Sequence, residues 1–379
     1  MDPLELLGYF ESRNPESVAL LRRLVDIESN SFDKRGVDKL AFFLMEEFRA
    51  RGAEAQVLQE PTRGNLLEAN WRGVRKPVLL LGHLDTVWPA GTLKTRPFRV
   101  ANGKAYGPGI FDMKSGILLA LLACEAFQKG YSDPGKGVNF LFTSDEEIGT
   151  EAGLPHLKSS AEKCAAVLCL EPPLPGGRAK TFRKGVSTYR VRVDGIASHA
   201  GVDHEAGANA IEEMSRHVLD LQAMTDYARG VTVSVGRVEG GSALNIVPAL
   251  AEAEVDVRTA SMADASWMDQ RIRSLRVHDP RCGLHVEGGV NRPPLERTEG
   301  VAALYLRARA AAAELGMELG EGPTGGGSDG SFTAAMGIPT LDGLGVDGAG
   351  AHAANEYVEI SDIPRRAALL CRLVQAIET

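Results

Sequence analysis

Three short apolar runs constrain the fold most, because each ends in a turn that carries acidic residues or histidine. The runs cover residues 78–81, 138–142 and 166–170. Runs that are apolar on both faces are typical of buried strands in a sheet covered by helices. Helical patterns lie between the runs, at residues 114–129 and 154–163. Strands that alternate with helices predict an α/β domain built on a mostly parallel sheet.

The pattern changes beyond Arg183, where apolar and polar residues alternate as they do in half-exposed strands. The expected order is strand 186–193, helix 207–224, strand 231–238, strand 251–258, helix 264–275 and strand 284–287. This βαββαβ order predicts a ferredoxin-like α+β domain, with a small antiparallel sheet and helices on one face. The helix-rich α/β pattern returns after residue 291. With 379 residues, two domains are expected: residues 1–182 and 292–379 form one, and residues 183–291 are inserted into it.

Composition limits the partners of the chain. A formal net charge of −8 disfavours nucleic acid and anionic lipid. The first residues, MDPLE, lack the basic start and apolar core of a secretory signal. The longest apolar run, 117–127, contains Glu125 and is shorter than the roughly 20 residues of a membrane-spanning helix. We therefore expect a cytoplasmic protein that binds neither membrane nor nucleic acid, with its five scattered cysteines reduced and mostly buried.

Candidate metal ligands follow the apolar runs. His83 comes after the first run, Glu147 after the second and Glu171 after the third, while Asp112 lies in a glycine- and proline-containing loop before a helix. The carboxyl ends of parallel strands meet at one edge of a sheet, so these side chains should converge. Converging carboxylates repel each other unless a cation neutralises them.

Imidazole and carboxylate ligands suit Zn²⁺ and related first-row ions. A carboxylate such as Asp112 can bridge two ions about 3.5–4 Å apart. Each residue alone is weak support, because a single histidine at a strand end is more often structural and an acidic cluster is usually a solvated loop. Their combination favours a metal site.

Four motifs resemble those of metallopeptidase family M20, most closely its glutamate carboxypeptidase branch. They are GHLDTV at 82–87, YGPG at 106–109 with DMKSG at 112–116, TSDEEIG at 143–149, and AHAANEYV at 351–358. The resemblance extends from about residue 70 to the last helix. It implies two divalent ions, with zinc expected and cobalt or manganese as alternatives. The implied ligands are His83 and Glu171 on one ion, Glu147 and His352 on the other, and Asp112 as the bridge.

The resemblance also implies the role of Glu146 as general base, next to a glutamate that binds metal. Asp85, two residues after His83, is expected to accept the second N–H of that imidazole, and a turn-forming aspartate is the alternative. His199 lies in SHAG at 198–201, which resembles a lid motif whose histidine reaches the active site of the other subunit. A homodimer through the inserted domain is implied, although His199 could also be an ordinary surface residue.

Three further residues resemble contacts to the substrate. Asn245 and Arg258 match positions that bind the substrate carboxylate, which a planar guanidinium can grip through two parallel hydrogen bonds. Arginines at strand ends are as often simply solvated. Gly326 lies in the glycine-rich segment 324–330, which lacks the lysine of a phosphate loop and resembles the family's loop beside the substrate.

These features predict a two-metal hydrolase that cleaves a C-terminal amide bond in a peptide or N-acyl amino acid with a free carboxylate. C-terminal glutamate is one candidate residue. An N-acyl-amino-acid deacylase or a dipeptidase of the same family is the alternative. A non-catalytic binding protein with this fold would have a broken ligand set, and none of the five ligands is missing.

Overall fold

The chain, described here for residues 2–378 in a computed structural model, divides into two compact units. Unit 1 comprises the residues up to Phe182, Glu296–Thr324 and the residues from Ser328 on. Unit 2 comprises Arg183–Leu295 together with Gly325–Gly327. The second boundary therefore follows Leu295 rather than residue 291, and part of the glycine-rich loop groups with unit 2.

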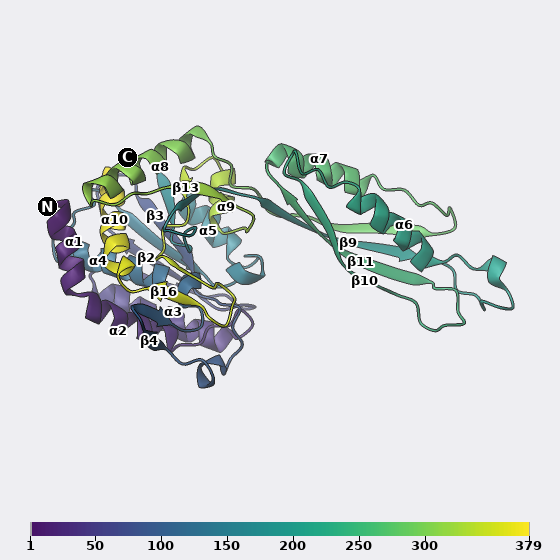
Figure 1. Ribbon diagram of the computed structural model, residues 1–379, viewed down its shortest axis with the longest axis horizontal. Helices are drawn as coiled ribbons and strands as arrows, with labels where there is room; N and C mark the ends of the chain where they lie inside the picture. The colour runs from purple at the N-terminus through teal and green to yellow at the C-terminus, as the bar shows by residue number, and fades with distance from the viewer. Residues whose placement is uncertain (1, 379) are drawn as a thin grey trace. The chain divides into compact units, whose positions relative to one another are not determined.

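A six-stranded sheet forms the centre of unit 1 (Figure 1). Its order is β1 (Glu54–Leu58), β2 (Leu66–Trp71), β6 (Val138–Thr143), β3 (Val78–His83), β7 (Ala166–Cys169) and β14 (Thr340–Leu341). The last four strands in this order run parallel, and β1 and β2 add an antiparallel edge. The three apolar runs are β6, β3 and β7, so the predicted mostly parallel α/β sheet is confirmed.

Both faces of this sheet are covered, because successive side chains of a strand point to opposite faces. Val78 and Leu80 of β3 join the larger core, whereas Leu79 and Leu81 join a smaller one. The larger core lies under α1 (Pro3–Ser12), α2 (Asn14–Val25), α3 (Lys34–Ala50), α4 (Ser115–Gln128), α8 (Glu299–Glu314) and α10 (Asp362–Ala376). The smaller core lies under α5 (Leu154–Ala161) and α9 (Gly330–Ala335).

Two small sheets complete unit 1. One has the order β15 (Gly348–Ala349), β16 (Tyr357–Glu359), β5 (Lys104–Tyr106) and β4 (Arg99–Ala101). The other pairs β13 (Glu321–Thr324) with β8 (Ala179–Arg183). Tyr357 lies opposite Tyr106 in the β16–β5 pair. This pairing brings the segment around residue 352 beside the loop that carries Asp112.

Unit 2 has the element order β9 (Gly185–Asp194), α6 (Ala210–Gln222), β10 (Thr232–Gly240), β11 (Leu250–Thr259), α7 (Met262–Arg273) and β12 (Gly283–Arg292). Its strands form one antiparallel sheet of order β10-β11-β9-β12. The helices α6 and α7 cover one face of this sheet (Figure 1), packing Met214 and Met268 against Val191 and Val255. The predicted βαββαβ arrangement is confirmed.

Side-chain caps explain where the helices of unit 2 begin. Asn209 accepts hydrogen bonds from the backbone N–H groups of Ile211 and Glu212 at the start of α6. Ser261 accepts one from Asp264 at the start of α7. Such caps satisfy N–H groups that have no partner inside the helix.

The composition led to expectations about the cysteines and about membrane-spanning helices. The five cysteines are buried and unbonded to one another, as predicted. Within residues 2–378, no helix combines the length and apolarity needed to cross a membrane.

Candidate metal centre

The five predicted metal ligands come together in unit 1. His83 is the last residue of β3, Glu147 lies in the 3-10 turn η3 (Glu146–Ile148) after β6, and Glu171 follows β7. Asp112 lies in η2 (Ile110–Lys114), directly before α4, and His352 lies between β15 and β16. Three parallel strands, β3, β6 and β7, thus bring candidate ligands to one edge of the sheet, where ligands of open α/β sheets bind.

His83 is the centre of a first group. Its Nε2 lies 3.3 Å from Oδ1 of Asp112 and 3.3 Å from Oε1 of Glu171. The imidazole is almost fully buried, so both carboxylates face it in a region with little water.

His352 is the centre of a second group that shares Asp112. Its Nε2 lies 3.4 Å from Oδ2 of Asp112 and 3.1 Å from Oε2 of Glu147. The backbone of His352 has a φ of 61°, in the left-handed region that few residues with a side chain adopt. Since the two oxygens of Asp112 face different histidines, this carboxylate has the position of a bridge.

The separations fit metal ions better than direct hydrogen bonds. A tetrahedral zinc ion with bonds of about 2.0–2.1 Å places neighbouring ligand atoms about 3.3 Å apart. Charge-assisted hydrogen bonds between nitrogen and carboxylate oxygen are shorter, at about 2.7–2.9 Å. The four nitrogen–oxygen distances of 3.1–3.4 Å therefore match the edges of two coordination polyhedra. The donor set of imidazoles and carboxylates suits zinc and related ions.

The pKa shifts within the cluster also indicate a site that favours positive charge. Contacts with Asp112 and Glu147 raise the pKa of His352 to about 10. Burial alone would lower the pKa of His83, but its contacts with Asp112, Asp85 and Glu171 raise it well above its usual value. Burial also raises the pKa of Glu147, and the charge of Asp112 adds to this effect. The cluster thus attracts positive charge, and a metal ion would replace protons there.

Asp85 supports the turn that carries the glutamates. Its Oδ1 accepts the N–H of Glu146 at 3.1 Å, and its Oδ2 accepts the N–H of Glu147 at 3.1 Å and the hydroxyl of Ser31 at 2.7 Å. Nδ1 of His83 lies 2.9 Å from the backbone oxygen of Asp85 and 3.4 Å from its Oδ1. The backbone carbonyl, rather than the expected carboxylate, is therefore the nearer partner of the imidazole.

Glu146 is buried at the start of η3, next to Glu147. Its negative charge is among the causes that raise the pKa of His83. The residue predicted to be the general base thus lies close enough to the first group to act on it electrostatically.

Glu356 is a supporting residue that the sequence analysis did not single out. Its Oε1 accepts the N–H groups of Phe111 and Asp112 at 2.8 and 3.0 Å. Its Oε2 accepts the N–H of Gly109 at 2.9 Å and the indole N–H of Trp88 at 2.8 Å. One carboxylate therefore fixes the loop that presents Asp112. Its place in the AHAANEYV motif was the available signal.

Lys114 is the cation nearest in sequence to Asp112, but it does not neutralise the cluster. Its buried Nζ donates a hydrogen bond to the backbone oxygen of Ile27 at 2.7 Å. Burial lowers the pKa of this ammonium to about 8. The charges that oppose this lowering are those of Glu356, Glu28 and Asp26, none of which is a candidate ligand.

The other predicted site residues belong to unit 2. His199 and Ile246 form an isolated antiparallel bridge, and the N–H of Ala200 donates to the backbone oxygen of Asn245. Nδ1 of His199 accepts the N–H groups of Gly201 and Val202, both at 3.1 Å. A neutral His199 therefore carries its proton on Nε2, and this exposed side chain has a donor to offer.

Arg258 lies beside the glycine-rich loop that contains Gly326. Its Nη1 is 3.5 Å from the backbone oxygen of Gly325. Its Nε and Nη2 donate to the two carboxylate oxygens of Asp256, each at 2.8 Å. Arg183 also contacts this loop, donating to the backbone oxygens of Gly326 and Gly327. A substrate carboxylate would have to share Arg258 with Asp256.

The sequence of the chain matches a known protein family. The model of peptidase family M20/M25/M40 matches residues 79–376. Carboxypeptidase G2 from Pseudomonas sp. (strain RS-16) is 33% identical over 371 residues, which are 95% of this chain and 89% of that protein. Succinyl-diaminopimelate desuccinylase from Nitrosococcus oceani is 28% identical over 327 residues, covering 81% of this chain and 86% of that protein.

A solved structure shares the fold. A dinuclear metal-binding peptidase of the M20 family from Bacillus subtilis superposes with a TM-score of 0.72 at 16% identity, covering 96% of this chain and 98% of that one. The family match covers most of the chain, and the resemblance of the motifs is thereby confirmed. The chain belongs to peptidase family M20/M25/M40.

Proposed function

We propose that this hydrolase uses two divalent metal ions, with zinc as the expected metal, to cleave a C-terminal amide bond in a peptide or N-acyl amino acid. His83 and Glu171 would hold one ion, Glu147 and His352 the other, and Asp112 would bridge them. The observation that carries the proposal is the pair of histidine–carboxylate groups that share Asp112, with separations of 3.1–3.4 Å.

The chain's own residues would move the proton. Two divalent ions held by these ligands would supply the electrostatic activation that makes a water nucleophilic toward a carbonyl carbon. Glu146, next to the ligand Glu147, accepts the proton of this water and returns it to the leaving amine. Asp85 holds the N–H groups of both glutamates, so it keeps the base and the ligand in a fixed relation.

Replacement of Glu146 by glutamine tests the proposed base. Because Glu146 binds no ion in this scheme, E146Q should retain both ions while its kcat falls by roughly 10²–10⁴-fold. Metal content by emission spectroscopy and steady-state hydrolysis of N-acyl amino acids are the two measurements. E151Q, which changes an exposed glutamate in the following turn, is the matched control and should behave like the wild type.

Two outcomes count against parts of this scheme. An active E146Q enzyme would remove the base assignment but leave the metal centre intact. A wild-type chain that binds fewer than two ions in unit 1 would remove the two-metal scheme itself.

The substrate carboxylate is proposed to meet Arg258, which lies beside the glycine-rich loop that contains Gly326. Asn245 is proposed as a separate contact to the substrate. One support is the position of the Arg258 guanidinium at the glycine-rich loop. The other is the similarity of the chain to a carboxypeptidase and to a succinyl-diaminopimelate desuccinylase. Glutamate is the first C-terminal residue to test. A deacylase or dipeptidase with the same metals is the second candidate, because one of the similar proteins is a desuccinylase, which removes an acyl group.

Truncation of Arg258 distinguishes these roles. R258A should raise the KM for substrates with a free carboxylate by roughly 10-fold or more, since a hydrogen bond to a charged group contributes about 1.5–3 kcal/mol. The KM for the same substrates with an amidated C-terminus should stay unchanged. R237A, at an exposed arginine of β10, is the control. An equal rise for both substrate forms would exclude Arg258 as the carboxylate contact.

A further inference from the structure

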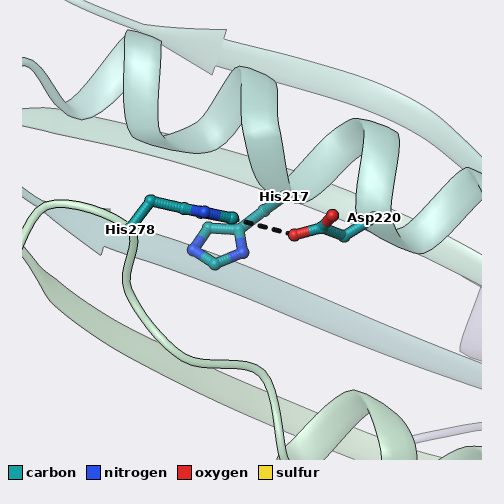
Figure 2. A group of neighbouring side chains, drawn as sticks. All are labelled: His217, Asp220 and His278. Atoms are coloured by element: carbon teal, nitrogen blue, oxygen red, sulfur yellow. Dashed lines mark hydrogen bonds and ion pairs between the residues drawn. The ribbon is translucent and has the colours of Figure 1, made fainter.

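A second group of potential ligands lies within unit 2, and none of its members belongs to the metal centre. His217 and Asp220 lie three residues apart on α6, and His278 lies in the connection between α7 and β12 (Figure 2). One ligand atom of each residue lies within 4.8 Å of those of the other two. Residues three apart on a helix share a face, so the helix presents its two side chains to the same loop.

His217 is the unusual member of this group. Its side chain is fully buried, yet neither ring nitrogen makes a hydrogen bond within the described part of the chain. Nε2 approaches Oε1 of Glu213 at 3.0 Å, but the two groups are not aligned for a hydrogen bond. A buried polar group without a hydrogen bond costs about 1–3 kcal/mol. The contact of Nε2 with Glu213 leaves Nδ1 without a hydrogen-bond partner in the described residues, so the ring keeps a nitrogen that could bind a ligand.

The other two residues give the group an accessible side. Nε2 of His278 lies 2.9 Å from Oδ2 of Asp220, and the two side chains are 35% and 45% exposed. The rings of His217 and His278 are 5.2 Å apart between their centroids. Figure 2 shows all three side chains gathered in the space between the helix and the loop. An ion could therefore enter from the solvent and reach the buried imidazole.

The loop that carries His278 is already fixed to the helix. Oε1 of Glu213 accepts the N–H of His278 at 2.7 Å, and Oε2 accepts the N–H of Asp279 at 3.0 Å. Glu213 lies one turn before His217 on α6. The two parts of the group therefore keep their relative position before any ion binds, which lowers the entropy lost on binding.

We propose that His217, Asp220 and His278 bind one divalent first-row metal ion, with water completing its coordination. Two imidazoles and one carboxylate are ligands that zinc, cobalt and nickel share. Tetrahedral zinc needs ligand atoms about 3.3 Å apart, so the 2.9 Å contact of His278 with Asp220 would open slightly and His217 would close in. The ion would satisfy the imidazole of His217 and link α6 to the loop before β12.

Counting bound zinc tests the site directly. The purified full-length protein, dialysed against micromolar ZnCl₂, should hold one more ion per chain than H278Q or D220N. Both substitutions affect exposed side chains, so folding and hydrolytic activity should persist. H285Q is the matched control, because His285 is also exposed and lies 3.1 Å from Asp194, but no third ligand joins this pair among residues 2–378. Equal zinc content in wild type and H278Q would overturn the proposal, as would an equal loss in H285Q.

Two more measurements separate this site from the metal centre. A chain with His83→Ala and His352→Ala should still bind one zinc ion, and adding D220N should abolish it. Zinc should raise the Tm of this double variant but not of the form that also carries D220N, because an ion stabilises only the state that binds it. An anomalous diffraction peak at the zinc edge between the three side chains would agree, and its absence in zinc-soaked crystals would refute the site.

Discussion

At the scale of single residues, the metal centre depends on side chains that would touch no ion. Asp85 accepts the backbone N–H groups of Glu146 and Glu147, and Glu356 accepts those of three residues in the loop around Asp112. Both carboxylates accept backbone N–H groups of the segments that carry candidate ligands. They fix the position of the ligands through the chain itself, which keeps each ligand side chain available for metal.

Glu356 offers the clearest test of such support. E356Q retains one acceptor oxygen and turns an NH₂ group toward two N–H donors, so the loop of Asp112 should shift. Supporting residues of this kind change metal affinity by roughly 10–100-fold, and a chelator competition assay would measure this loss. E359Q, in the same segment but paired on the surface with Lys104, is the control. Unchanged affinity in E356Q would mean that the loop holds Asp112 without Glu356.

Sequence reasoning singled out the candidate ligands but not all of the residues that support them, for a physical reason. His83, Glu147 and Glu171 are visible because each follows an apolar strand, and strand ends converge in any parallel sheet. Glu356 bonds to Gly109 and Phe111, which lie 247 and 245 residues away. No local pattern encodes such a contact. The carboxylate of Asp85 lies 3.4 Å from Nδ1 of His83, but its shorter contacts are to the N–H groups of η3, and these depend on how two strands lie together.

At the scale of elements, the start of α4 packs directly on the end of β7. A Cβ atom at Gly116 would lie 2.1 Å from the backbone oxygen of Leu170, closer than any real contact. Asp112 precedes this helix and Glu171 follows Leu170. Because Gly116 has no side chain, α4 can approach the end of β7 closely. This close approach sets the spacing of the candidate ligands Asp112 and Glu171.

Adding one methyl group tests this spacing. G116A should destabilise the protein by about 1–3 kcal/mol, the usual cost of overpacking, and should also weaken metal binding. Urea unfolding and chelator competition measure the two effects. G8A is the control, because the new Cβ in α1 meets nothing within 4 Å. Its free energy of unfolding should rise by up to about 1 kcal/mol. Normal metal affinity in G116A would show that the ligands tolerate a displaced helix.

Elements with a regular period were the most predictable. The pattern in unit 2 gave its strands and α-helices in the right order, and every end except that of β12 lies within three residues of the prediction. Strand β12 extends to Arg292, well beyond the predicted end at residue 287, because Gly288 and Gly289 interrupt the alternation. The short strands β15 and β16 had no signal of their own, since they are stabilised by pairing with each other and with β5.

At the scale of the whole molecule, the candidate residues divide between the two units. The candidate metal ligands and Glu146 belong to unit 1, whereas His199, Asn245, Arg258 and Gly326 belong to unit 2. We therefore expect substitutions in unit 2 to change kinetic constants without changing the metal content of unit 1. The proposed homodimer adds a further condition, because His199 would serve the active site of the other subunit.

Mixed dimers test this arrangement. H199Q and E146Q should each be nearly inactive alone, but coexpression should restore about a quarter of wild-type activity, because half of the dimers are mixed and each has one intact site. E146Q with E147Q is the control and should not recover, since both changes affect the same unit. No recovery in the first pair, or a monomer in sedimentation analysis, would contradict action of His199 across a dimer.

The route of the chain through unit 1 also affects when the enzyme becomes active during synthesis. Candidate ligands begin at His83 and end at His352, and Glu356 follows. Unit 2 is complete except for its glycine loop once Leu295 has left the ribosome. A nascent chain can therefore contain most of its inserted unit while it still lacks His352, the last of the candidate ligands along the sequence. Hydrolysis at the proposed metal centre would therefore begin only after residue 352 has been synthesised.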